Sequence, residues 1–248
     1  MSKYFDLDGA VALVTGANRG IGRVFVQELL HAGAARVYAG ARDPQSLAEL
    51  ARADARVVPV ALDVADDESV LAAAARLPDV TLLVNNAGVA RGERLIGAQD
   101  LAAARQEMEV NYFGVLRMSR AFAPVLAANG GGALINVLSI LARVASPAAG
   151  SYSASKAAAF ALTQAVRAEL RAQGTLVVGV LPGYVDTDMV ARLDVPKIAP
   201  ADVVQAALAA LASGDEDVYP GETATQIAAA LQRDPKAVER QFAQSVAG

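Results

Sequence analysis

Short runs of β-branched and aliphatic residues alternate with longer runs rich in alanine and leucine from the start of the chain to about residue 181. This alternation is typical of consecutive βαβ units, in which helices join parallel strands and pack on both faces of one sheet. It predicts strands over residues 10–15, 36–40, 56–61, 80–84, 132–137 and 175–181. It predicts helices over residues 20–32, 45–53, 67–76, 100–128 and 150–172, followed by shorter helices from residue 200 to about 246. We therefore expect an α/β fold with a doubly wound parallel sheet.

Nothing in the sequence divides the 248 residues into separate parts. It contains no linker-like segment, low-complexity tract or internal repeat, and its length is sufficient for one large core. We expect a single Rossmann-type domain over residues 1–248, with a helical C-terminal segment over about 200–246.

Composition excludes several classes of function. The formal net charge of -4 gives no basic field that would favour nucleic acid or an anionic membrane. The chain has no cysteine, which excludes a thiolate metal site. Its one histidine, His31, stands before Ala32-Gly33 at the predicted end of a helix, where we expect it to interact with the helix dipole, so no histidine is left for a zinc site or a Ser-His-Asp triad. The N-terminus lacks the features of a secretory signal, and proline and glycine break the uncharged stretch over residues 121–142. We expect a cytoplasmic protein without a resident metal and without a membrane or nucleic-acid partner.

A glycine-rich loop follows the first predicted strand and opens the first predicted helix. Glycines permit a tight turn and close approach of the backbone, and a helix N-terminus offers free N–H groups to a pyrophosphate. A plain structural turn would also explain the loop taken alone, but its place after the first strand favours dinucleotide binding. The candidate binding residues are Gly16, Asn18, Arg19, Gly20, Ile21 and Gly22.

The second predicted strand ends without the carboxylate that usually binds the ribose hydroxyls of NAD. Arg42 stands just beyond that position, and Arg19 lies in the glycine loop. Two guanidinium groups could converge on a 2′-phosphate, although two solvated surface arginines would give the same pattern. We choose NADP(H) over NAD(H) as the cofactor.

Ser139, Tyr152 and Lys156 are the candidate catalytic residues. Tyr152 and Lys156 are four residues apart, so on a helix they share a face. A cation in an otherwise small and apolar segment is costly unless its charge is needed. A nearby ammonium favours phenolate, so we expect Lys156 to lower the pKa of Tyr152. An ordinary helix pair would explain the tyrosine and lysine by themselves, whereas the three together predict a device that delivers a proton to a carbonyl oxygen.

These motifs, taken in order, resemble the short-chain dehydrogenase/reductase family, in its short single-domain branch. The resemblance runs from about Gly9 to Met189. The first motif is Thr-Gly-x-x-x-Gly-x-Gly over residues 15–22, and Tyr-x-x-x-Lys over 152–156 follows Ser139 after thirteen positions. The others are Asp63-Val64, Asn85-Asn86-Ala87-Gly88, Asn111, Pro182-Gly183 and Thr187.

The resemblance implies roles in nucleotide binding for residues at the ends of several strands. Those expected beside the adenine and its ribose are Asp63, Val64, Asn86, Ala87 and Gly88. Those expected to hold the nicotinamide carboxamide are Pro182, Gly183, Val185 and Thr187. Tyr152 and Lys156 are expected to contact the nicotinamide ribose as well.

Hydride transfer to a ketone leaves negative charge on oxygen, so catalysis needs donors aimed at that oxygen and an available proton. We assign Tyr152 as general acid in reduction and base in oxidation, and Ser139 as the group that polarises the carbonyl. Lys156 would tune the phenol and bind the ribose. Asn111, polar in an apolar segment, would hold a water that continues the proton relay, unless it is a satisfied core asparagine.

The substrate pocket is expected to be mostly apolar and fairly open. The residues that we predict to line the pocket are Ile140, Leu141, Tyr184 and Met189. Further candidates are Val89, Leu95, Ala145 and Leu193. Such a lining favours a neutral, hydrophobic ketone, aldehyde or secondary alcohol, although core packing would explain each residue singly. Arg91 and Arg143 are interpreted as surface residues.

The chain departs from the family pattern at two places. Leu138 stands where a second serine usually precedes the catalytic one, and residues 216–221 lead into helical sequence instead of a terminal strand and glycine-rich tail. The second departure argues against the usual tetramer. We expect a homodimer through the helices over 100–128 and 150–172, with a tetramer as the alternative.

Two alternative functions make different demands on the sequence. A non-catalytic NADP(H) sensor would keep the nucleotide fold and signal through the C-terminal helices, but such relatives commonly lack the tyrosine. A sugar-nucleotide epimerase or dehydratase needs a sizeable C-terminal substrate domain, for which 248 residues leave no room.

Overall fold

The computed structural model describes residues 4–244, and the last two residues of the predicted helical tail, 245 and 246, lie outside that range. The described chain forms one parallel sheet of seven strands in the order β3-β2-β1-β4-β5-β6-β7. The strands are β1 (Val11–Thr15), β2 (Arg36–Ala41), β3 (Val57–Ala61), β4 (Leu82–Asn85), β5 (Ala133–Val137), β6 (Leu176–Val180) and β7 (Asp217–Val218). The chain reverses its direction of travel across the sheet between β1 and β4, which is the arrangement expected of a doubly wound Rossmann-type fold. The predicted fold class is therefore confirmed.

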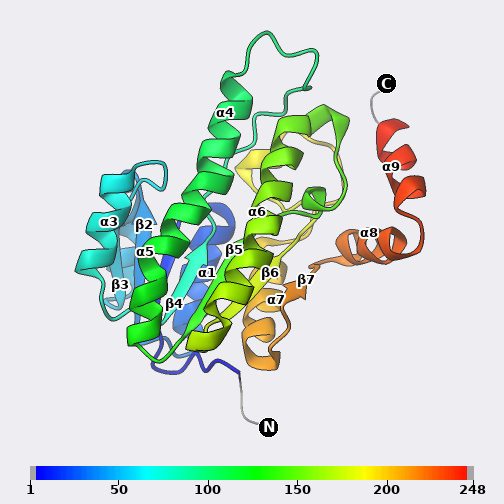
Figure 1. Ribbon diagram of the computed structural model, residues 1–248. Helices are drawn as coiled ribbons and strands as arrows, with labels where there is room; N and C mark the ends of the chain where they lie inside the picture. Colours follow the sequence, from blue (N-terminus) through cyan, green and yellow to red (C-terminus); the bar gives the residue numbers. More distant parts are fainter. Residues whose placement is uncertain (1–3, 245–248) are drawn as a thin grey trace.

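Helices cover both faces of this sheet (Figure 1). The helices on one face are α1 (Gly20–His31), α2 (Ala48–Ala53) and α7 (Pro200–Ser213). Those on the other are α3 (Asp67–Arg76), α4 (Ala102–Met108), α5 (Val115–Ala128) and α6 (Gly150–Leu170). Because each helix joins two parallel strands, all of them run opposite to the strands, and their N-termini lie at the carboxyl edge of the sheet.

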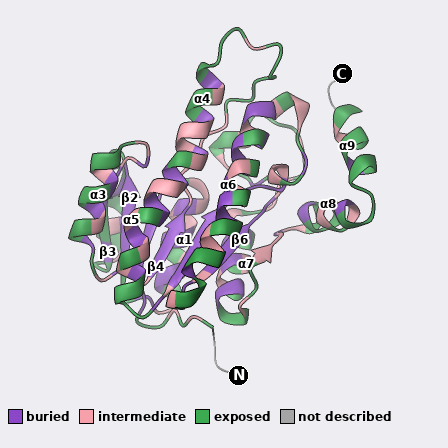
Figure 2. Ribbon diagram, in the orientation of Figure 1, coloured by how far each residue is buried: buried purple, intermediate pink, exposed green. Residues whose placement is uncertain are grey.

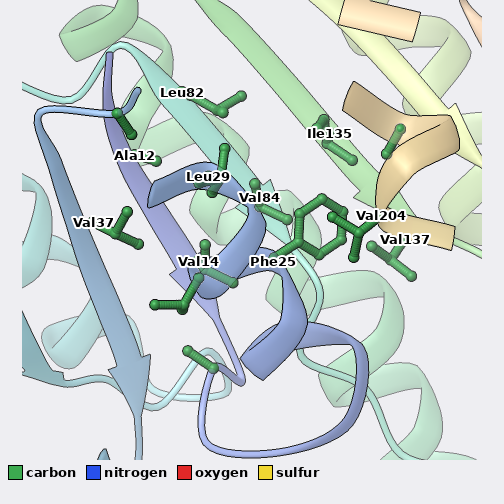
Figure 3. Close-up of a cluster of buried hydrophobic side chains, with 14 of the residues drawn as sticks. Ala12, Val14, Phe25, Leu29, Val37, Leu82, Val84, Ile135, Val137 and Val204 are labelled. Carbon is green, nitrogen blue, oxygen red and sulfur yellow. The ribbon is translucent and has the colours of Figure 1, made fainter. Parts of the chain in front are cut away.

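The central strands are buried on both faces, which explains why they read as continuous apolar runs. Phe25 and Leu29 of α1 are fully buried and pack in one cluster with Val14 and Val84 of the adjacent strands and Val204 of α7 (Figure 3). A second cluster on the opposite face contains Met118 and Phe122 of α5. The two clusters fix α1 and α5 on opposite sides of the strands whose ends carry the candidate site.

The predicted helix over residues 100–128 is not continuous. The structure has α4, then a π-helical segment over Glu109–Gly114, then α5. The widened turn contains Asn111, and such π-helical insertions often occur at functional sites. Sequence periodicity does not distinguish this segment from an α-helix, because one inserted residue shifts the pattern only slightly.

The C-terminal segment forms two helices, α8 (Glu222–Arg233) and α9 (Pro235–Ala243), after the short strand β7, which the sequence did not predict. The two helices extend away from the sheet and are largely exposed on their outer surfaces (Figures 1 and 2). Leu231 and Val238 pack with Val144, a residue that follows Ser139 closely in the chain. This arm is therefore anchored beside the candidate site.

Within the described residues, no helix is long and apolar enough to cross a membrane.

Candidate functional site

The glycine loop after β1 and the Asn-Asn-Ala-Gly loop after β4 meet at the point where the strand order reverses. The buried Thr15 hydroxyl accepts the backbone N–H groups of Asn86 at 2.9 Å and Ala87 at 3.0 Å. Asn86 Nδ2 donates to the carbonyls of Thr15 at 2.9 Å and Gly16 at 3.1 Å. Asn86, Ala87 and Gly88 are thereby held against the glycine loop. Crevices at such a reversal are the usual ligand sites of doubly wound sheets.

The glycine loop has the shape that a pyrophosphate requires. Gly16 and Gly20 have φ angles of 64° and 52°, a region that favours glycine. A Cβ atom at Gly22 would lie 2.2 Å from the Gly16 carbonyl oxygen, so α1 packs against the loop only because this residue has no side chain. Asn18, Arg19 and Ile21 occupy the turn and the first residues of α1, where N–H groups are free. The predicted loop residues therefore fit a dinucleotide.

The two predicted 2′-phosphate ligands differ in their surroundings. Arg42 is exposed just after β2, and within residues 4–244 its guanidinium has no ion pair or hydrogen bond. Arg19 is also exposed but pairs with Asp188 at 3.5 Å. Arg42 is therefore free to bind an anionic ligand. Arg19 would first have to break its ion pair with Asp188.

Asp63 and Val64 follow β3, as expected. Asp63 Oδ1 accepts the Ala65 N–H at 3.0 Å, and its own N–H donates to Ser69 Oγ at 3.0 Å. Val64 is largely buried, and a Cβ atom on Gly114 would lie 2.9 Å from its Cγ2 atom. These contacts place the residues beside the π-helical segment, between β1 and α5.

The loop after β6 lies against both the glycine loop and the segment of Ser139. The Pro182 carbonyl accepts the Ile140 N–H at 2.9 Å. A Cβ atom at Gly20 would lie 3.2 Å from Thr187 Cγ2, and Gly183 faces Thr223 of α8. Val185 is buried and pairs with Ile198, which closes the base of the loop. The predicted nicotinamide-side residues thus line the same crevice as the pyrophosphate-side residues.

Asn111 is fully buried and ties the loop after β4 to α6. Its Oδ1 accepts the Val89 N–H at 2.9 Å, and its Nδ2 donates to the Val89 carbonyl at 2.8 Å and to Ser155 Oγ at 2.9 Å. Both hydrogens of the amide are therefore engaged. A relay water at this position would have to be held by the remaining lone pair of Oδ1 or by the backbone.

Ser139, Tyr152 and Lys156 come together from the end of β5 and the first turns of α6. Ser139 is 7% and Lys156 6% exposed, and Tyr152 is half-buried. Lys156 Nζ lies 5.8 Å from the centre of the Tyr152 ring and donates to the Val137 carbonyl at 2.9 Å. A Cβ atom on Gly88 would lie 3.6 Å from Lys156 Nζ and 3.1 Å from Asn111 Oδ1. All four candidate catalytic residues therefore surround the ends of β4 and β5.

Burial dominates the electrostatics of this centre. It raises the pKa of Tyr152 to about 12, against the lowering effect of the Ser139 hydroxyl and with a further raising effect of the Glu107 carboxylate. Burial also lowers the pKa of Lys156 to about 8. The prediction that Lys156 lowers the pKa of Tyr152 is wrong for the protein on its own. Its ammonium is itself destabilised by burial, and its hydrogen bond goes to a backbone carbonyl.

Several apolar side chains around the crevice are exposed. Leu95, Tyr184, Met189 and Leu193 are between 41% and 59% exposed, and Leu141 is partly so. Ile140, by contrast, is 4% exposed and belongs to the packed wall. The four most exposed of these apolar side chains lie in residues 92–101 and 184–197. We call these two segments the substrate rim. Arg91 and Arg143, which border it, have neighbours within the chain: Gln106 for Arg91, and Tyr219 and Phe160 for Arg143.

The structure gives positioning roles to polar residues that had no assigned role in the sequence-based predictions. Asn85 Nδ2 donates to Asn136 Oδ1 at 2.9 Å, and Asn136 Nδ2 donates to Thr163 Oγ1 at 2.9 Å. This buried chain connects β4 and β5 to α6, so it sets the position of the helix that carries Tyr152 and Lys156. The available signal was the presence of amides in strands that are otherwise apolar. Thr15, Ser155 and Glu107 were missed as well.

Metal binding finds no support in the part of the chain that the structure describes, where no group of three or more His, Asp or Glu side chains is placed to hold an ion.

Comparisons with known proteins agree with this geometry. The sequence matches the family model of short chain dehydrogenases over residues 10–197. It is 37% identical over 224 residues to cis-4-hydroxycyclohexanecarboxylate dehydrogenase of Sinomonas cyclohexanicum, a match that covers 88% of this chain and 87% of that protein.

Several of the similar solved structures are nucleotide complexes, with NADP, NADPH or NAD. A short chain dehydrogenase from Burkholderia cenocepacia J2315 in complex with NADP has 49% identity and a TM-score of 0.92, covering 96% of this chain and 99% of that one. A short chain dehydrogenase/reductase from Burkholderia phymatum in complex with NAD has 26% identity and a TM-score of 0.83, covering 96% of each chain.

Proposed function

This chain belongs to the short-chain dehydrogenase/reductase family and is an oxidoreductase by that membership. We propose that it transfers hydride between NADP(H) and a neutral, largely apolar ketone, aldehyde or secondary alcohol. The observation that carries this proposal is the convergence of Ser139, Tyr152 and Lys156 on the crevice that the glycine loop also lines.

Tyr152, Ser139 and Lys156 have separate roles in the proposed reaction. A bound nicotinamide would supply or accept the hydride. In reduction, Tyr152 donates a proton to the oxygen that becomes negatively charged, and Ser139 donates a hydrogen bond to the same oxygen. A phenol whose pKa burial raises to about 12 holds its proton at neutral pH, which suits this role as an acid. Lys156, held by the Val137 carbonyl, would contact the ribose.

The choice of NADP(H) over NAD(H) rests on Arg42. Its guanidinium is exposed beyond β2 and is unpaired within residues 4–244, so it is free to form a charge-assisted hydrogen bond with a 2′-phosphate. The B. cenocepacia relative binds NADP, which supports the choice, whereas the more distant B. phymatum relative binds NAD.

Replacing Arg42 tests this preference. Arg42→Ala should weaken NADPH binding by roughly tenfold to a hundredfold, since a hydrogen bond to a charged group contributes about 1.5–3 kcal/mol. NADH binding should change little. Titration calorimetry with both nucleotides measures the difference, and Arg76→Ala, an exposed arginine on α3, is the control. An equal loss for both nucleotides would overturn the assignment.

The proposed substrate class rests on the exposed apolar side chains of the substrate rim. The name of the S. cyclohexanicum relative describes a ring alcohol that also bears a carboxylate. Arg91 and Arg143, which border the rim, already have partners, whereas Arg94 and Arg192 lie within it and are exposed. We favour a neutral substrate because the residues that we assign to the pocket are apolar.

A parallel screen tests activity, cofactor and substrate together. The purified protein is mixed with NADPH or NADH and a panel of apolar ketones, with polyols and hydroxy acids tested in the oxidative direction. Steady consumption of NADPH with apolar ketones is expected. Tight NADPH binding without turnover across the panel would favour a nucleotide sensor, and preferential use of acids or polyols would refute the substrate class.

Partners and location remain parts of the same proposal. We propose a cytoplasmic homodimer that buries the outer surfaces of α5 and α6, where Phe113 of the π-helical segment is 41% exposed. Light scattering after gel filtration measures the mass. A monomer or a tetramer would contradict the dimer.

A further inference from the structure

Glu107 is a buried carboxylate that the proposed chemistry does not use. It lies in α4, one helical turn before Asn111, and its side chain is fully buried. Its Oε1 accepts the backbone N–H of Arg91 at 2.6 Å. Its Oε2 is also buried and has no hydrogen-bond partner within the described chain. Burying such an atom without a partner costs free energy, so the position needs an explanation.

Helix α6, which packs against α4, also contains a buried polar atom without a hydrogen-bond partner in the described chain. Helices α4 and α6 run parallel, because each precedes a parallel strand on the same face of the sheet. The two helices pack together, and the π-helical segment that continues α4 is tied to α6 where Asn111 Nδ2 donates to Ser155 Oγ at 2.9 Å. One turn closer to the N-terminus of each helix lie Glu107 and Ser151, and Ser151 Oγ is likewise buried without a partner. An unpaired acceptor and an unpaired hydroxyl therefore lie at matching positions of two packed helices.

We propose that Glu107 and Ser151 hold a buried water molecule between α4 and α6, and that Glu107 is a positioning residue of the catalytic centre. A water can accept from Ser151 Oγ and donate to Glu107 Oε2, which satisfies both atoms. The other oxygen of the carboxylate fixes the backbone at Arg91, next to the Val89 segment that Asn111 holds. Glu107 and Asn111 thus clamp the same loop over the crevice.

The charge of Glu107 acts on Tyr152, the residue that follows Ser151. The Glu107 carboxylate contributes to raising the pKa of Tyr152, because a nearby negative charge disfavours phenolate. Arg91 lies in the loop whose backbone Glu107 holds, and its guanidinium binds Gln106. Arg105 and Glu109 lie beside Glu107 in the chain, and Tyr152 and Lys156 lie on the neighbouring helix α6. In its proposed role Glu107 keeps the proton on Tyr152, which favours carbonyl reduction. This role of Glu107 in carbonyl reduction rests on the proposed function.

A crystal structure at high resolution tests the water without any assay. The wild-type protein should show one ordered water within hydrogen-bonding distance of both Glu107 Oε2 and Ser151 Oγ. Ser151→Ala, which removes one partner, should lose it or show it at reduced occupancy. A dry wild-type site, or full occupancy in Ser151→Ala, would overturn the proposed water site.

The pH profile of reduction tests the positioning role. Glu107→Gln keeps the shape and an acceptor for the Arg91 N–H but removes the charge, so the loss of activity on the alkaline side should move to lower pH. Glu107→Asp keeps the charge and should restore the wild-type profile. Glu169→Gln, an exposed carboxylate change on α6, is the matched control and should leave the profile in place. An unmoved profile in folded Glu107→Gln would refute the role of the charge.

A direct titration separates this inference from the proposed function. The phenol of Tyr152 can be followed by NMR of ring-labelled tyrosine, with Tyr152→Phe to assign the signal, whether or not the protein turns over a substrate. The Tyr152 signal should titrate at lower pH in Glu107→Gln than in the wild type. If wild type lacks activity while this shift is present, the proposed reaction fails and the role of Glu107 stands. If Glu107→Gln does not fold, the same titration in Glu107→Asp should match wild type, and a marked departure would count against the role.

Discussion

The proposed catalytic centre and the substrate rim belong to the same candidate site, yet they are held in different ways. Asn111 is fully buried and Lys156 is 6% exposed, and both have hydrogen bonds to the backbone of neighbouring segments. In the rim, Ile96 is 98% exposed and Met189 is 50% exposed. The centre is built on strand ends and helices, whereas the rim consists of loops and a short 3₁₀ turn.

This difference separates two tasks. Proton delivery needs groups held within fractions of an ångström, and packing in a sheet-helix scaffold provides that precision. Substrate choice depends on shape and polarity at the edge, where loops tolerate change. Substitutions in the centre should therefore abolish chemistry, while those in the rim should alter which substrate is used.

The largest expected effect is at Tyr152. Tyr152→Phe removes the proton donor and should lower kcat by about 10²–10⁴-fold, the usual contribution of general acid catalysis. Tyr4→Phe, at a tyrosine that is 73% exposed, is the control. Rates with NADPH and circular dichroism of both variants give the measurement, and near-normal turnover in folded Tyr152→Phe would remove the proton-delivery role.

The next effect concerns stability and pH. Burial lowers the pKa of Lys156 from 10.5 to about 8, so between these values the unfolded chain binds more protons than the folded one. Stability of wild type relative to Lys156→Met should therefore rise as pH increases from 8 towards 10.5, by on the order of 3 kcal/mol in total. Urea unfolding at several pH values up to 10 measures most of this change, and the titration of Tyr152 in the unfolded chain is common to both variants and cancels in the difference.

Lys236→Met, at an exposed lysine on α9, provides the matched control and should give a flat difference from wild type over the same range. A flat difference for Lys156→Met as well would show that the Lys156 ammonium is not destabilised in the fold.

A pair of glycine substitutions compares the scaffold and the rim directly. Gly22→Ala would place a Cβ atom 2.2 Å from the Gly16 carbonyl oxygen, so the variant should lose about 2 kcal/mol of stability and bind NADPH more weakly. Gly97→Ala in the rim has 3.8 Å of clearance and should be nearly neutral. Thermal unfolding and nucleotide titration measure both, and equal losses would contradict the contrast.

The smallest effect is expected at Met189. Met189→Ala removes a half-exposed apolar contact in the rim, so KM for an apolar ketone should rise by about twofold to fivefold while kcat is kept. Steady-state kinetics over a series of ketones of increasing size measures this. A fall in kcat with KM unchanged would mean that the rim takes part in the chemistry.

Much of the fold could be predicted because it depends on local patterns. Apolar runs such as residues 82–84 predict buried strands, and glycines such as Gly22 predict a tight turn with close packing, so strand positions and the glycine loop after β1 follow from residue order. Element ends and interruptions did not follow. The π-helical segment at Asn111 and the two-residue β7 depend on contacts with distant segments.

The sequence by itself determined which groups are available: a tyrosine and a lysine one turn apart, a serine thirteen positions before the tyrosine, and Arg19 and Arg42 in a chain that lacks the usual NAD-selective carboxylate after the second strand. Only the tertiary structure decided how those groups behave. Burial sets the pKa values of Tyr152 and Lys156, and the packing of distant segments buries Glu107 Oε2 and Ser151 Oγ without a hydrogen-bond partner in the described chain. The physical reason is that residue types and helical spacing are local properties of a chain, whereas desolvation and electrostatic proximity arise only when distant segments pack together.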